Sequence, residues 1–141
     1  MLTVSTSQIN EIVDSASGFA VVPLAKVTYD DEPYKCAVSA AGEHVAVCRA
    51  RCGVYVLRTA ALPRTDPHTV LPFTAWTAVF ARTPNTLICG GRPPNSGEIA
   101  VFDIDSDTLL RSRKVQSDTI FSIHQSHNSR FLASASGYSL A

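Results

Sequence analysis

Residues 86–103, which read TLICGGRPPNSGEIAVFD, contain the pattern that decides the fold. Residues 87–91 are a short apolar run that ends in two glycines, and residues 98–103 are a second short run that ends in an aspartate. A loop with two prolines and an asparagine separates the two runs. Short apolar runs between clusters of Gly, Pro and Asn are typical of buried strands. This stretch therefore predicts two consecutive strands joined by a loop.

The same scheme recurs along the chain. Ala46, Ile88 and Ala133 hold the same place in three successive units, 42 and 45 residues apart. The strands that this scheme predicts are residues 34–39, 45–48 and 53–57 in the first unit, 74–80, 87–91, 98–103 and 108–110 in the second, and 119–123 and 131–136 in the third. A period of about 40–45 residues with several strands per unit indicates the blades of a β-propeller. We therefore expect an all-β fold, a partial β-propeller of four-stranded antiparallel blades.

The repeat also suggests where the blades begin and end. We expect a propeller region over residues 18–141, with blades at about 34–72, 73–117 and 118–141, the last of them incomplete. The apolar residues 19–27 could supply outer strands of a preceding blade. Residues 1–17 are expected to be a poorly defined N-terminal segment or a short helix, with Ser7 as its N-cap.

The repeated motifs resemble those of the WD-repeat family. The turn after the inner strand is SAAG at 39–42, RTPN at 82–85 and SHNS at 126–129. The second strand is LICGG at 87–91 and LASAS at 132–136, and the third is VYVLR at 54–58 and IAVFD at 99–103. The resemblance covers residues 34–136. It implies a non-catalytic scaffold for protein–protein interaction, which binds proteins or peptides on its loop face.

The sequence accounts for fewer blades than a closed ring contains. It shows two full units, half of a third and a leading segment, whereas propellers have about 4–8 blades. One explanation is that the chain is part of a longer propeller, or a truncated product without independent function. The other is that several copies associate to complete a ring. We favour the first explanation at this point.

Six charged residues fall in loops that share one face of such a propeller. They are Arg49, Arg51 and Arg92 between second and third strands, and Asp30, Asp31 and Glu32 before the first inner strand. Arginine is the charged residue most often found as an interface anchor, so these residues are the candidate partner-binding surface. The alternative is that they are ordinary solvated loop residues. Trp76, at the start of an inner strand, is expected in the core rather than on this surface.

Composition and motifs argue against other functions. Twelve basic and twelve acidic side chains give a formal net charge of zero, which does not favour direct binding to nucleic acid. The four cysteines lack the paired spacing of a zinc site, and we expect them to be buried thiols. Asp103, Asp105 and Asp107 are expected to form a turn rather than a calcium loop. We therefore predict no metal and no cofactor.

The sequence also argues against catalysis. Residues 34–39, 74–80 and 119–123, which would line the central channel, contain no Asp, Glu or His. Converging side chains of those types are what a propeller enzyme needs, so the chain is predicted not to be an enzyme. The alternative is a fragment of a propeller enzyme of the lactonase-like class, which the strands at 54–57 and 99–103 somewhat resemble. No apolar run approaches the ~20 residues of a membrane span, and the N-terminus does not resemble a secretory signal, so a cytoplasmic or nuclear location is expected.

Overall fold

The computed structural model describes residues 5–15, 18–29, 33–50, 53–62, 64 and 66–137. In the first two of these ranges it describes the path and pairing of the backbone. The described residues contain twelve strands and one short 3₁₀ turn, η1 (Thr59–Ala61). Among them, no helix is long and apolar enough to cross a membrane. The all-β fold predicted from the sequence is confirmed.

Two four-stranded antiparallel sheets form the centre of the molecule. The strands of the first are β3 (Pro33–Val38), β4 (His44–Arg49), β5 (Val54–Arg58) and β6 (Thr69–Leu71). Those of the second are β7 (Ala75–Phe80), β8 (Thr86–Gly91), β9 (Glu98–Asp103) and β10 (Thr108–Lys114). In each sheet the strands lie side by side in chain order. This arrangement is that of propeller blades, with β3 and β7 as the inner strands.

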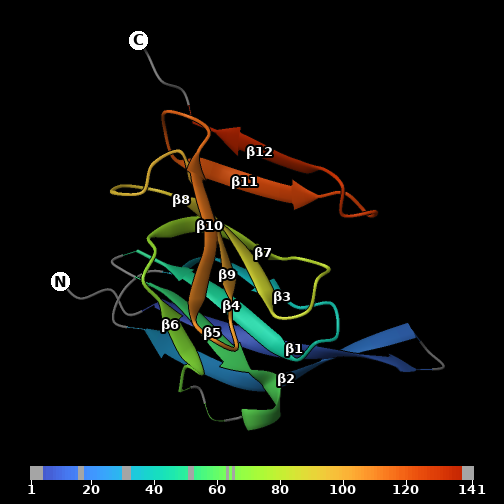
Figure 1. The fold of residues 1–141 in the computed structure, drawn as a ribbon. Coiled ribbons are helices and arrows are strands. Elements are labelled where there is room, and N and C mark those ends of the chain that lie inside the picture. Colours follow the sequence, from blue (N-terminus) through green and yellow to red (C-terminus); the bar gives the residue numbers. More distant parts are fainter. Residues whose placement is uncertain are drawn as a thin grey trace.

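A two-stranded sheet lies at each end of this pair. The half-sheet consists of β11 (Ile120–Gln125) and β12 (Leu132–Ser136), and its inner strand β11 packs beside β7. The N-terminal hairpin consists of β1 (Ser5–Ser15) and β2 (Gly18–Tyr29). Figure 1 shows the sheets following one another as a row, with the half-sheet at one end and the N-terminal hairpin at the other. The structure is therefore a partial propeller, as predicted.

The prediction of a short helix within residues 1–17 is wrong. Residues 5–15 form the strand β1, which pairs with β2 along its whole length. The capping signal at Ser7 is weak by comparison with the β-branched residues Ile9, Ile12 and Val13, which restrict side-chain rotation in a helix and favour a strand. Eleven cross-strand pairs then outweigh the single helical turn that a cap could support.

Burial on both faces explains why the strands read as continuous apolar runs. On β4, Ala46 and Cys48 belong to the apolar cluster between the two complete sheets, while Val45 and Val47 belong to a cluster on the other face. On β8, the side chain of Ile88 packs away from the first sheet, against Ile120 and Ile123 of the half-sheet. The second strands β4 and β8 are therefore buried on both faces, which removes the polar alternation expected of a half-exposed strand.

Candidate functional site

Each inner strand carries a β-bulge near its start, and the bulged residue is aromatic in all three. The strand register shifts between Pro33 and Lys35, between Ala75 and Thr77, and between Ile120 and Ser122. The residues left without a cross-strand partner are Tyr34, Trp76 and Phe121, which we call the bulge aromatics. A bulge turns the extra side chain away from the regular pleat of the sheet. The repeat therefore places three aromatic rings together at the rim of the inner strands.

The bulge aromatics form a continuous stack across three blades. The ring centroids of Tyr34 and Trp76 are 4.3 Å apart, with planes inclined by 20°. Those of Trp76 and Phe121 are 5.1 Å apart in an edge-to-face arrangement. Such ring pairs contribute about 0.5–1.5 kcal/mol each beyond the area that they bury. Trp76, which the sequence assigned to the core, is only half-buried, and Phe121 is 40% exposed.

Two cations flank the stack. The guanidinium of Arg92 lies over the ring of Tyr34, 4.8 Å from its centroid, and its Nη1 donates to the carbonyl oxygen of Ala50 at 2.8 Å. The ammonium of Lys35 donates to the backbone oxygen of Phe121 at 2.6 Å. Arg92 therefore joins the second blade to the first, and Lys35 joins the first blade to the half-sheet.

A folded loop holds Arg92 in this position. The amide of Asn95 donates to the oxygen of Arg92 at 2.6 Å, and the amide of Arg92 donates to the oxygen of Thr74 at 3.0 Å. The Asn95 side chain closes the arrangement, because its Oδ1 accepts from the amide of Thr74 at 3.2 Å. The loop between β8 and β9 is thus tied to the segment that enters β7, close to Trp76.

The structure describes the surroundings of two of the six predicted site residues, Arg92 and Arg49. Arg92 contacts the loop that follows β4, because its guanidinium donates to the carbonyl oxygen of Ala50. Arg49 is 6% exposed, and its guanidinium lies 4.0 Å from the ring centroid of Tyr55, so it packs against its own sheet. Arg51, Asp30, Asp31 and Glu32 lie outside the described residues. Sequence reasoning missed the bulge aromatics, although their spacing of 42 and 45 residues matches the repeat.

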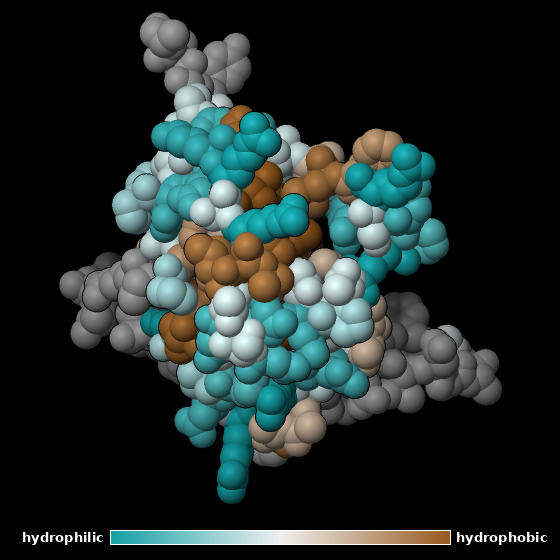
Figure 2. Space-filling model, viewed as in Figure 1, coloured by the Kyte–Doolittle hydropathy of each residue, from teal (hydrophilic) through white to brown (hydrophobic). Residues whose placement is uncertain are grey.

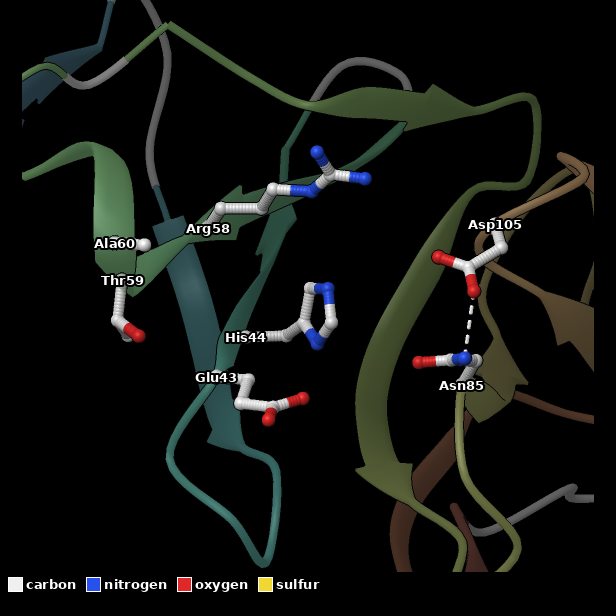
Figure 3. A pocket seen from close by; sticks show the side chains of 7 residues that line it. All are labelled: Glu43, His44, Arg58, Thr59, Ala60, Asn85 and Asp105. Carbon is white, nitrogen blue, oxygen red and sulfur yellow. Dashed lines mark hydrogen bonds between the residues drawn. The ribbon is translucent and has the colours of Figure 1, made fainter.

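A cleft of about 400 Å³ opens at the opposite end of the sheets, between the two complete blades. Figure 3 shows Glu43, His44 and Arg58 of the first blade on one side and Asn85 and Asp105 of the second on the other. The Nδ2 of Asn85 donates to Asp105 Oδ2 at 2.6 Å, and Arg58 Nη2 lies 3.1 Å from His68 Nε2. Cationic and anionic groups are therefore intermixed in this cleft.

The cysteines and aspartates that the structure describes show no arrangement suited to a metal ion. Within the described part of the chain, no group of three or more His, Cys, Asp or Glu could hold one. Burial raises the pKa of the Cys48 thiol to about 12 and raises that of Cys89 well above its usual value, so both stay protonated. Cys36, expected to be buried, is exposed. Asp103 forms the expected turn, because its Oδ1 accepts from the amides of Asp105 and Ser106.

One inner strand, β11, contains a histidine that the sequence analysis did not place there. Strand β11 extends to Gln125 and so includes an exposed histidine, His124, which the predicted strand left out. The strands β3 and β7 contain no Asp, Glu or His.

Comparison with solved structures assigns the chain to the β-propeller class of folds. It resembles the β-propeller domain of Cps50 (Swd1) from Myceliophteria thermophila, with 15% identity and a TM-score of 0.66 over 79% of this chain and 38% of that one. It also resembles hydrazine synthase from Kuenenia stuttgartiensis, with 16% identity and a TM-score of 0.64 over 84% of this chain and 32% of that one. At these identities the likeness shows the fold alone. No family model and no curated protein matches the sequence.

Proposed function

We propose that the chain is part of a non-catalytic propeller scaffold that docks proteins or peptides on the face formed by the bulge aromatics and Arg92. The observation that carries the proposal is the aromatic stack on three consecutive bulges. Tyrosine, tryptophan and arginine are the residue types that most often dominate binding energy at protein interfaces. Here a tyrosine contacts both a tryptophan and an arginine on partly exposed surface.

The rigidity of this surface supports a docking role. The rings rest on strands rather than on loops, and they hold one another in place across the blades. Arg92 is restrained by its hydrogen bond to Ala50 and by the folded loop behind it. A partner would therefore lose little entropy in ordering the site, which favours affinity.

The contents of the inner strands support a scaffold rather than an enzyme. In the described chain, His124 is the one imidazole or carboxylate on β3, β7 and β11, so no acid–base pair faces the central channel from these strands. General acid–base catalysis needs such groups within hydrogen-bonding reach of one another.

Peptide display against the immobilised chain tests the proposal. Peptides that the chain enriches should quench or shift the fluorescence of Trp76, which is the single tryptophan of the sequence. Trp76→Ala should weaken their binding by roughly thirtyfold or more, since hot-spot truncations cost about 2 kcal/mol or more. Phe131→Ala is the matched control, because Phe131 is an exposed aromatic, 66% accessible, near the other end of the half-sheet. Equal loss in both variants, or no loss in Trp76→Ala, would overturn the proposal.

A further inference from the structure

The half-sheet is exposed where its counterparts in the other blades are buried. All six residues of β4 are buried, and so are five of the six residues of β8. Strand β12 holds the same second place in its blade, yet three of its five residues are exposed and the other two are half-buried. Phe131 and Leu132 add apolar surface at 66% and 40% exposure. Strand β12 therefore has the apolar and small residues of a buried second strand, but in this structure they are exposed or half-buried.

Figure 2 shows apolar surface next to the half-sheet. Hydrophobic side chains gather in the middle of this view, beneath the strands β11 and β12 of Figure 1. An unpaired strand edge next to apolar surface is a template for a further strand.

The free edge of β12 can be assigned residue by residue. The amide of Ser126 donates to the oxygen of Phe131, and the amide of Gly137 donates to the oxygen of Thr119. Antiparallel pairs alternate, so the odd-numbered residues of β12 bond to β11 and the even-numbered residues point their backbone groups to the other edge. Ser134, in the middle of the strand, therefore presents its amide N–H and its carbonyl oxygen there.

Gln116 contacts this edge and has a polar atom without a hydrogen-bond partner among the described residues. Its Nε2 donates to the oxygen of Ser134 at 3.4 Å. Its Oε1 is buried and has no hydrogen-bond partner within the described part of the molecule. A buried acceptor without a donor costs free energy, and the amides of an added strand would be suitable donors.

The N-terminal hairpin has the strands that the half-sheet lacks. Three residues separate β2 from β3, as three separate β6 from β7, so β2 holds the place of a fourth strand and β1 that of a third. Pro23 lies within β2 and has no N–H for a sheet ladder, which suits the outermost strand of a blade. In the described structure β1 pairs with β2 on one side and with no strand on the other. The free edges of β12 and β1 therefore correspond to a second and a third strand.

We propose that two copies of this chain close a ring, with the β12 edge of each copy paired to the β1 edge of the other. The two half-blades of each contact form one four-stranded blade. Each copy contributes two complete blades and two half-blades, and each half-blade pairs with one from the other copy. The two copies together therefore make a six-bladed ring. Six lies within the usual range of about 4–8 blades, whereas three copies would exceed it. The zero formal net charge leaves no strong repulsion between copies.

Light scattering on the chromatographic peak of the chain tests the proposal. The expected mass is twice the 15.1 kDa of one chain. Ser134→Pro should halve it, because proline removes the outward N–H at the centre of the edge while leaving the bonds to β11. Ser134→Ala keeps that N–H and should leave the mass unchanged. A monomeric wild-type chain, as expected if a segment of a longer protein covers the edge, would overturn the proposal, and so would a dimeric Ser134→Pro.

Amide exchange decides the matter without a variant. In the dimer, the amide of Ser134 should exchange slowly and as part of the same cooperative unit as the inward amides of β12. Fast exchange at Ser134 beside slow exchange at Ala133 and Ala135 would show an open edge and overturn the proposal. Neither readout depends on peptide docking, so the proposed function can fail while the dimer stands.

Discussion

Gly42, Asn85 and Ser129 hold the same place in three successive blades and share a backbone conformation that most residues avoid. Their φ angles are +73°, +59° and +60°, in the turns that follow the inner strands. Glycine and asparagine adopt this conformation readily, which made the first two turns predictable from the sequence. Serine does not favour it, so the positive φ of the third turn was not predictable from Ser129 itself.

Gly90 sets how closely the second blade and the half-sheet approach. A Cβ at this position would lie 2.7 Å from Ile120 Cγ2 and 2.9 Å from Ile123 Cδ1. Gly90→Ala should lower the free energy of unfolding by about 1–3 kcal/mol, because the layers must move apart. Urea denaturation measures this change, with Ser112→Ala on the exposed strand β10 as the control. Equal stability of the two variants would contradict the close packing.

Asp103 should titrate below the ordinary range of an aspartate. The amide of Ser106, and then that of Asp105, lowers the pKa of its carboxyl from 3.8 by hydrogen bonding to the charged form. A lowered pKa in the folded state means that the contribution to stability is complete above pH 3.8 and is lost as the pH falls through the folded value. NMR titration should show this midpoint, and Asp103→Ala should weaken the acid dependence of unfolding. A midpoint at or above 3.8 would contradict the role of the turn.

At the scale of elements, strands with an apolar run of four or more residues were predictable, whereas a very short strand and a charged one were not. Strand β6 (Thr69–Leu71) was missed because it is three residues long and lies between Pro67 and Pro72. Strand β10 was predicted for residues 108–110 only, whereas it continues to Lys114 through residues that are all exposed and mostly charged. An outermost strand with neither face buried leaves no periodic apolar pattern in the sequence.

Only part of the candidate site was predictable from the sequence. The repeat predicts Arg92 on the loop face, because equivalent loops share a face, and partner binding on that face stays a prediction. The bulges at Tyr34, Trp76 and Phe121 did not, since a one-residue register shift depends on how two strands pair rather than on either strand alone.

The contact of Arg92 with the first blade yields a prediction about the joint between blades. Arg92→Ala should destabilise the chain by about 1–2 kcal/mol, through loss of the hydrogen bond to Ala50 and of the cation–π contact with Tyr34. Arg92→Lys should recover only part of this loss, because a point charge lacks the planar fork of a guanidinium. Thermal unfolding measures both. Full recovery by lysine would show that charge alone matters at this position.

At the scale of the whole molecule, the layers are stabilised by apolar clusters between neighbouring sheets. One cluster joins the two complete blades, and a smaller one joins the second blade to the half-sheet. The outer side of the half-sheet has no such cluster among the described residues, and β12 is correspondingly exposed. The sequence predicted this row of blades and left open whether a longer chain or a second copy completes it. In the proposed dimer, the free edges of β12 and β1 pair between two copies.

The most direct test is an NMR experiment on a mixture of isotope-labelled and unlabelled chains, filtered for contacts between copies. The account predicts backbone contacts from β12 of one copy to β1 of another, with those around Ser134 at antiparallel cross-strand distances. If no contact between β12 of one copy and β1 of another is observed, the closed six-bladed ring is contradicted.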